Sequence, residues 1–179
     1  MKFKRFGFML LVVLLLGFVG AASAAEKVIF TDGLEDIDAE ANVPKGWVVF
    51  SNNNGDYGSA SKDIVRSGSL SWFMDDPSST ASLGIRSPKI PAEAGKIYRA
   101  ASYVFVLSGT ANLYIEFWDA DGARLGPQST KNTVRNEWEE IFVTKEAPAG
   151  TKFVSLILYS QQTNTGAHYF DDVTIMEID

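Results

Sequence analysis

The sequence predicts an all-β fold, an antiparallel β-sandwich of two sheets packed face to face. Beyond the N-terminal segment, short apolar runs alternate with clusters of Gly, Pro, Asn and Asp, a pattern typical of all-β proteins. No segment has a convincing helical period. The apolar runs are numerous, and two packed sheets are the economical way to bury one face of each strand.

Turn signals separate the expected strands. They lie at residues 52–55 (NNNG), 67–68 (SG), 75–77 (DDP), 121–122 (DG) and 147–150 (APAG), and Gly, Pro and Asn are the strongest local markers of turns. Between them we expect strands at 27–30, 46–51, 62–65, 69–74, 81–87, 97–107, 112–119, 138–145, 152–160 and 168–178.

Residues 98–118 are expected to form a long hairpin with its turn at residues 108–110. Alternation along a strand gives it two faces, and Glu116 distinguishes them because burying an unpaired carboxylate is costly. The face with Glu116 is therefore predicted to be accessible and Phe117 to point into the core. Arg99 marks the accessible face of the first strand in the same way. That leaves Tyr98, Ala100, Ser102, Val104 and Val106 inside.

Aromatic side chains are expected along this accessible face. Four half-exposed rings would present about 300–500 Å², near the upper limit for one patch on a monomer. A pyranose ring has an apolar C–H face that stacks on such rings, and its hydroxyl groups need polar partners. The alternatives are that loops or strands cover the rings, or that a one-residue register shift reverses the face. The predicted ligand-binding residues are Tyr103, Tyr114, Glu116, Trp118, Tyr159, Gln161 and Arg99, with Gln162 and Phe105 at the margin.

The N-terminal segment has the pattern of a secretory signal peptide. Three positive residues precede an apolar run over residues 6–19, and Ala22-Ser23-Ala24 fits the small-x-small rule for cleavage. We expect cleavage after Ala24, or after Ala25, and an extracellular domain over residues 25–179. An uncleaved anchor is the alternative.

Charge and cysteine content narrow the possible partners. The chain has 16 Lys+Arg, 22 Asp+Glu and no Cys. Without the signal peptide the balance is 13 against 22, a net charge of −9. This argues against nucleic acid and anionic membranes as partners and suits a neutral ligand. We also expect a monomer. The absence of Cys excludes disulfides and thiolate chemistry.

Six blocks in order resemble carbohydrate-binding modules of families 4, 9 and 22. The blocks are FTDGLED followed by PKGW, RSGSLSW, IPAEAGKIYRAASYVFV, LYIEFWDADG, EWEEIFVTKEAPAGTKFVSLILY and HYFDDVTI. The resemblance implies a galactose-binding-like jelly roll that binds a β-glucan, xylan or related polysaccharide without cleaving it, and that could assist separate glycoside hydrolases. The opening differs from the usual Asn-x-Gly-Phe-Glu, with Leu34 at the apolar position.

The resemblance also implies a structural calcium ion. Its ligands would be Glu35, Asp171 and backbone carbonyls such as that of Gly33 or those of residues 66–68, which suits the oxygen preference of calcium. Asp172 is the alternative to Asp171, and the alternative to a metal site is a set of ordinary loop carboxylates. The Asp-rich segment 119–122 lacks the other ligands of a calcium loop and is expected to be a turn.

Little in the sequence favours catalysis. His168 is the single His and is expected to be structural, and Glu116 has no evident acidic partner of the kind that glycosidases need. Trp47 and Trp138 are expected in the core, whereas the pattern around Trp72 leaves it between core and rim. The rival functions are a cell-surface protein-interaction domain and a small jelly-roll glycan lyase or hydrolase.

Overall fold

Residues 26–179, which the computed structural model describes, consist of twelve β-strands and connecting turns. The predicted signal peptide, residues 1–24, lies outside this part. No helix of the described part is long and apolar enough to cross a membrane. The strands are β1 (Glu26–Asp32), β2 (Val48–Ser51), β3 (Ser59–Ser61), β4 (Ser71–Asp76), β5 (Leu83–Arg86), β6 (Ile90–Pro91), β7 (Ile97–Val106), β8 (Ala111–Trp118), β9 (Arg124–Asn132), β10 (Trp138–Glu146), β11 (Phe153–Ser160) and β12 (Gly166–Ile178).

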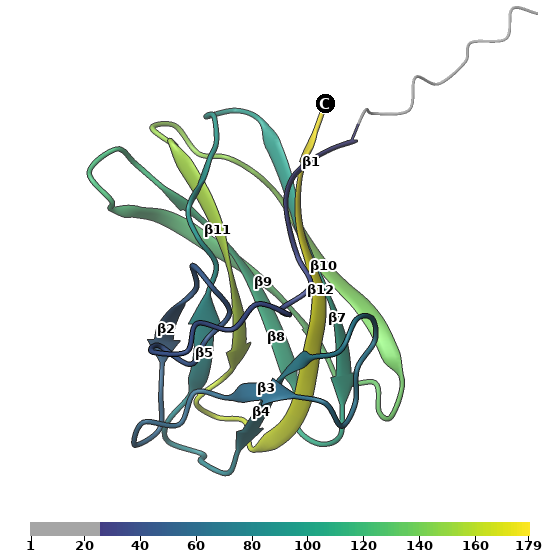
Figure 1. Cartoon of the computed structure of the whole chain (residues 1–179). Helices are drawn as coiled ribbons and strands as arrows, with labels where there is room; N and C mark the ends of the chain where they lie inside the picture. Colours follow the sequence, from purple (N-terminus) through teal and green to yellow (C-terminus); the bar gives the residue numbers. More distant parts are fainter. Residues whose placement is uncertain (1–25) are drawn as a thin grey trace, which may run out of the picture.

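The strands form two sheets packed face to face (Figure 1). Sheet I has the order β10-β7-β12-β4-β3, and β1 also pairs with β12. Sheet II has the order β2-β5-β11-β8-β9, and β6 also pairs with β11. All these pairs are antiparallel. The predicted antiparallel β-sandwich is therefore confirmed.

The predicted hairpin over residues 98–118 is wrong, because β7 and β8 belong to different sheets. β7 pairs with β10 and β12, and β8 pairs with β9 and β11. The turn between them crosses from sheet I to sheet II and packs on the turn before β12. A Cβ on Gly109 would lie 2.4 Å from the carbonyl oxygen of Thr165. Alternation defines the faces of each strand but not its neighbours, so a hairpin and a crossing between sheets look alike in sequence.

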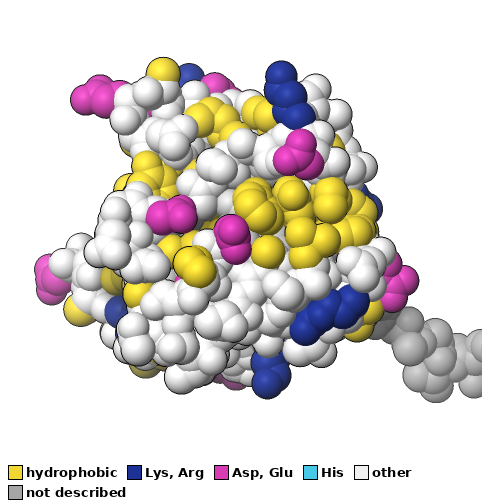
Figure 2. Space-filling view, turned by 90° about the horizontal axis from the view of Figure 1, so that it is seen from below, with side chains coloured by type: hydrophobic (Ala, Val, Ile, Leu, Met, Phe, Trp, Pro, Cys, Tyr) yellow, Lys and Arg dark blue, Asp and Glu magenta, His cyan; other side chains and the backbone are white. Residues whose placement is uncertain are grey.

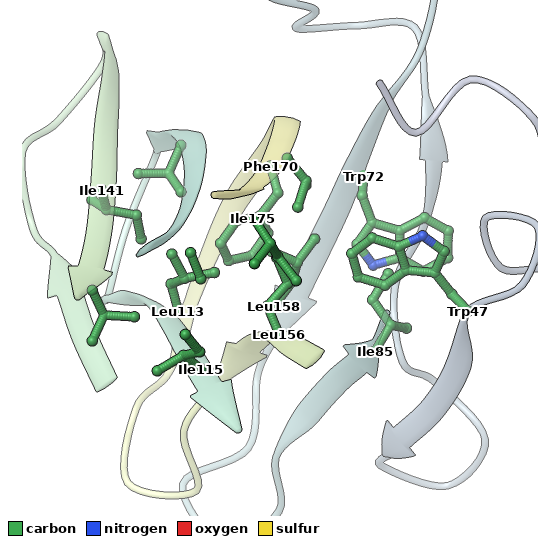
Figure 3. Packing of buried hydrophobic residues seen from close by; sticks show 14 of the residues in the cluster. Trp47, Trp72, Ile85, Leu113, Ile115, Ile141, Leu156, Leu158, Phe170 and Ile175 are labelled. Carbon is green, nitrogen blue, oxygen red and sulfur yellow. The ribbon is translucent and has the colours of Figure 1, made fainter. Parts of the chain in front are cut away.

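The face assignment within these strands is confirmed. Phe117 is fully buried in the core between the sheets, as are the inward residues predicted for β7. Trp47 is in the core as expected, and Trp72 also proves to be buried there. Figure 3 shows apolar side chains of the two sheets packed in the core, with Trp47 and Trp72 both among them.

One predicted strand is absent, and β3, β6 and β9 were not among the expected strands. Residues 62–65 are not a strand but part of the turn between β3 and β4. β9 was not expected, since its sequence RLGPQSTKN contains a Gly, a Pro and mostly polar residues. β9 lies at the edge of sheet II, and edge strands tolerate Pro because part of their backbone needs no partner. This missed strand supplies residues to the site described next.

Candidate functional site

The outer face of sheet II carries the side chains that the sequence predicts for β8. Tyr114, Glu116 and Trp118 point away from the core, as do alternate residues of β11. Pairing of β8 with β11 places Ile157 opposite Tyr114, and Tyr159 follows two residues later on the same face. The predicted neighbourhood of Tyr114 and Tyr159 is therefore confirmed.

Three aromatic rings frame a hollow on this face. The Tyr114 and Tyr159 rings meet edge to face, with centroids 5.6 Å apart and an interplanar angle of 89°. Phe50, from β2, approaches Tyr159 in a similar way at 5.7 Å and 65°. The hollow has a volume of about 150 Å³. Its lining residues are Phe50, Tyr114, Arg124, Pro127, Ile157 and Tyr159.

Glu116 points outward as predicted, but it is neither accessible nor unpaired. Its carboxylate is 0% exposed and accepts hydrogen bonds from Arg86 Nε at 2.7 Å and from Arg124 Nη1 at 2.8 Å. Ser155 Oγ lies 3.5 Å from it. A buried carboxylate is tolerated when it is paired and hydrogen-bonded. The two arginines come from β5 and the missed strand β9, so the sequence did not reveal this arrangement.

Trp118 does not provide the open stacking surface that the sequence predicts. It is only 8% exposed, and its Nε1 donates a hydrogen bond of 2.9 Å to Ser155 Oγ. Lys89 Nζ lies 3.9 Å from its ring centroid and the guanidinium carbon of Arg86 lies 4.9 Å away. Cations thus cover the indole.

Tyr103 and Arg99 lie on the outer face of sheet I, away from the other predicted site residues, because β7 is not in sheet II. The guanidinium of Arg66 covers the Tyr103 ring at 3.3 Å. Arg99 forms an ion pair of 2.8 Å with Glu140 and stacks over Phe142 at 4.2 Å. Sequence reasoning assigned both residues to one platform with Tyr114, and this assignment is wrong.

The two predicted glutamines lie in the turn after β11. Gln161 is exposed, two residues beyond Tyr159. Gln162 Nε2 donates a hydrogen bond of 2.7 Å to the carbonyl of Thr80. Neither side chain lines the hollow.

A second set of aromatic side chains runs across the outer face of sheet I. The strand register aligns Phe73, Tyr169, Phe105 and Trp138 on β4, β12, β7 and β10. Phe73 and Tyr169 have ring centroids 4.5 Å apart, and Phe105 and Trp138 5.7 Å apart. Trp138 is thus on the outer face, and its predicted place in the core is wrong. Figure 2, seen from below, shows an apolar patch with charged side chains at its border at the lower end of the molecule.

Two of the residues predicted to bind calcium, Glu35 and Asp171, contact one turn, residues 66–70, whereas no contact of Gly33 with this turn is seen in the described residues. Glu35 accepts hydrogen bonds from the backbone N–H groups of Ser69 and Leu70 at 2.9 and 3.1 Å. Asp171, which is fully buried, accepts them from the N–H groups of Arg66 and Ser67 at 2.9 and 3.2 Å. The two carboxylates therefore lie against the same short segment, as the resemblance implies.

Asp172 differs from Asp171 in its contacts. Its carboxylate pairs with the side chains of Arg66 and Ser67, so Asp171 is the better candidate ligand. Burial raises the pKa of Asp171 against the opposing effect of the backbone N–H groups, and a bound cation would favour the charged form. Among residues 26–179 no three acidic or His side chains cluster as a metal site. Backbone carbonyls would have to supply most of the six to eight oxygens that calcium takes.

His168 is structural, as predicted. It is 0% exposed, neither ring nitrogen has a hydrogen-bond partner, and its ring packs edge-on against Phe170 at 5.2 Å. Desolvation lowers its pKa to about 3. A neutral imidazole enclosed in the core cannot reach a substrate.

Comparison with known proteins supports the fold. No model of a known protein family matches the chain, and no curated protein sequence matches it. The CBM22-1 xylan-binding domain of Paenibacillus barcinonensis Xyn10C is similar in structure, with a TM-score of 0.57 and 13% identity over 88% of this chain and 99% of that domain. A structure described as "CBM4 structure and function" has a TM-score of 0.53 and 19% identity over 81% of this chain and 96% of that one.

The enzymatically active domain of tailspike protein 4 from Bacteriophage CBA120 is also similar. Its TM-score is 0.62 and its identity 16%, over 75% of this chain. This chain spans only 20% of the length of the tailspike structure. At these identities the similarities show a shared β-sandwich fold of the carbohydrate-binding-module type.

Proposed function

We propose that this chain is a non-catalytic carbohydrate-binding domain that holds a polysaccharide on the outer face of sheet II. The observation that carries the proposal is the hollow of about 150 Å³ between Phe50, Tyr114 and Tyr159. Apolar rings that remain partly exposed suit the C–H face of a sugar. The hollow is smaller than the roughly 300–1,000 Å³ of pockets that enclose a drug-sized ligand, so one sugar ring would enter it.

The structural neighbours support this proposal. Two of them are described as a xylan-binding domain and as a CBM4 module. We propose a β-glucan, xylan or related polysaccharide as the ligand, and a secreted, monomeric protein, in keeping with the predicted signal peptide. The ligand contacts would come from Tyr114 and Tyr159, with Phe50 and Arg124 as contacts that the sequence did not indicate and Gln161 at the rim.

The surroundings of Glu116 favour binding over catalysis. General acid–base work needs a carboxyl group within reach of the substrate. Glu116 is enclosed beneath two arginines that hydrogen-bond both of its oxygens. We therefore propose a structural role for it. An assay for reducing sugars or unsaturated products, with Glu116→Gln as control, tests the proposed absence of cleavage, and product formed by the wild type but not by the variant would contradict it.

We also propose that calcium stabilises the turn at residues 66–70. Glu35 and Asp171 would supply carboxylate oxygens, and carbonyls such as that of Gly33 the remainder. Support comes from the two carboxylates on one turn and from the burial of Asp171. The ion would hold the N-terminal segment after β1 against the bulge of β12 and would take no part in ligand contact.

Affinity electrophoresis on a panel of polysaccharides tests the binding proposal. Tyr114→Ala and Tyr159→Ala should each weaken binding about tenfold, because one stacking contact contributes roughly 1–1.5 kcal/mol. Tyr103→Ala on sheet I is the matched control and should leave retardation unchanged. Circular dichroism would verify that each variant folds. If folded Tyr114→Ala and Tyr159→Ala variants are retarded like the wild type on every binding glycan, the hollow is not the site.

A second candidate function is contact with a protein partner through sheet I. The aromatic row formed by Phe73, Tyr169, Phe105 and Trp138 favours it, because aromatic side chains are enriched at protein interfaces and all of these except Tyr169 are partly exposed. A glycan array distinguishes the two functions. No bound glycan would favour the protein-interaction function, and a bound glycan lost with Tyr114→Ala would favour the first.

A further inference from the structure

The outer face of sheet II is basic although the chain as a whole is acidic. The formal net charge of the chain is −6. On this face, strand pairing places Arg124 beside Trp118 and Lys131 beside Asn112, and Arg86 opposite Ile157. Lys89 lies over the Trp118 ring.

The acidic residue that strand pairing places on the same face does not offer its charge to a ligand. Glu116 is 0% exposed, and its oxygens accept hydrogen bonds from Arg86 and Arg124. One carboxylate shared by two guanidinium groups leaves one positive charge in excess. Arg124 is 44% exposed and lines the hollow, so the excess charge is accessible beside the aromatic rings.

Lys89 adds a second accessible positive charge. Its side chain is exposed, and in the described part of the chain it forms no ion pair with a carboxylate. The nearest turn, between β8 and β9, contains Asp119, whose Oδ1 accepts hydrogen bonds from the N–H groups of Asp121 and Ala123. Asp121, in the same turn, is exposed and forms no ion pair with Lys89.

We propose that the hollow takes an anionic sugar ring, so that the ligand is a polysaccharide bearing carboxylate or sulfate groups. This inference rests on the proposed carbohydrate-binding function and specifies its ligand class. The sugar ring would stack on Tyr114 or Tyr159, and its anionic group would lie toward Arg124. Arginine suits this role because its guanidinium can bind Glu116 with one edge and present its remaining N–H groups to a ligand. The expectation of a neutral ligand, drawn from total charge, ignores this local distribution.

Isothermal titration calorimetry can test the proposal with matched polymers. The probes are polygalacturonate and glucuronoxylan, each compared with its carboxyl-reduced neutral form, and a sulfated galactan compared with its desulfated form. At low ionic strength at least one anionic polymer should bind about tenfold more tightly than its neutral form, and added salt should reduce that difference because exposed charges are screened. Preference for the carboxylated or for the sulfated member identifies the source of the charge.

Variants then connect the preference to this face. Lys89→Gln should reduce affinity for the anionic polymer about two- to fivefold, while binding of the neutral form stays the same. Arg124→Gln removes a residue that lines the hollow, so it should weaken binding of the anionic polymer more than binding of the neutral form. Lys62→Gln, in the turn after β3, removes the same charge elsewhere and should have no effect. Lys89→Glu should weaken binding further, and because its side chain is exposed the substitution leaves the core intact.

The outcomes separate this inference from the proposed function. If neutral and anionic forms bind equally, and Arg124→Gln and Lys89→Gln bind like the wild type, the anionic ligand is wrong and the carbohydrate-binding function stands. If no polymer binds, charged or neutral, both proposals are wrong. If the anionic polymer is preferred but Lys62→Gln weakens it as much as Lys89→Gln, the preference comes from total charge and the assignment to sheet II is wrong.

Discussion

Glu116 and Arg86 form an ion pair of 2.7 Å across sheet II, although their strands, β8 and β5, are separated by β11. The Arg86 guanidinium carbon lies 4.9 Å from the centroid of the Trp118 ring and 4.5 Å from that of the Phe50 ring. Together with Arg124 the ion pair connects the centre of the sheet to its edge. The outer face of sheet II is therefore stabilised by ion pairs to a buried carboxylate as well as by packing of aromatic side chains.

Replacing Glu116 with Gln should lower the free energy of unfolding by roughly 1.5–3 kcal/mol, because two charge-assisted hydrogen bonds lose their buried acceptor while Arg86 and Arg124 stay partly exposed to solvent. Urea unfolding followed by tryptophan fluorescence measures this. Arg124→Gln is the control and should cost about 1 kcal/mol or less, because Arg124 is largely exposed and Arg86 still pairs with the carboxylate. If both variants lose the same free energy of unfolding, the buried Glu116 carboxylate contributes no more to stability than the exposed Arg124 side chain.

Gly68→Ala should be more destabilising than Ala at a turn Gly that also has positive φ but has no neighbouring atom near its Cβ position. Gly68 has φ +67°, and a Cβ there would lie 2.1 Å from Glu35 Oε1, so Ala would both strain the backbone and displace the carboxylate from the N–H groups of Ser69 and Leu70. Gly95→Ala is the matched control, because Gly95 has φ +80° with no atom within 4 Å of its Cβ. The control should lose about 1–2 kcal/mol from backbone strain alone. Thermal unfolding of the two variants checks the difference, and a Gly68→Ala variant no less stable than Gly95→Ala would contradict the steric argument.

The free energy of unfolding should decrease as the pH is lowered from about 6.5 to about 3, because of His168. Its pKa is lowered to about 3 by desolvation in the folded state, whereas the unfolded chain takes up the proton near pH 6.5, so acid favours unfolding by about 1.4 kcal/mol for each pKa unit. His168→Leu should flatten the profile in this window. Urea unfolding at several pH values, compared between wild type and variant, measures the effect.

Asp76 and Asp171 change stability with pH in the direction opposite to His168. The effect of His168 must therefore be measured as the difference between the wild type and His168→Leu. Burial raises the pKa of each carboxyl group. Their contributions are present below the unfolded pKa and are lost as pH rises through the folded pKa. Both groups are the same in wild type and His168→Leu, so they cancel in the difference. Identical slopes for the two proteins would contradict the assigned role of His168.

Calcium should raise the midpoint of thermal unfolding, and a chelator should reverse the rise, because an ion that binds only the folded state stabilises it. Glu35→Gln and Asp171→Asn should abolish the shift. Asp172→Asn is the control and should retain it, because the Asp172 side chain pairs with Arg66 and Ser67 instead. Scanning calorimetry with and without calcium measures the shift. If calcium does not change the midpoint for the wild type, the two carboxylates act only as hydrogen-bond acceptors for the turn.

Much of the fold and part of the site follow from sequence because their causes are local. Nine of the ten expected strands overlap strands of the structure, and the orientation of Tyr114, Phe117 and Tyr159 is as predicted. Trp138 was misassigned because an aromatic residue at the start of a strand fits either face. β9 was missed because an edge strand needs few apolar residues. Arg124 and Pro127, which lie on β9 and line the hollow, were therefore not predicted as site residues.

The sequence by itself determined which side chains of β7, β8 and β11 face the core, because alternation and the cost of burying charge act within a few residues. Only the tertiary structure decided which outward side chains meet. It separated Tyr103 from Tyr114 by placing β7 and β8 in different sheets, and it brought Arg86 and Arg124 to Glu116. The physical reason is that a strand's hydrogen-bonding neighbours come from distant parts of the chain, so the chemistry of a sheet face depends on pairings that no local pattern records.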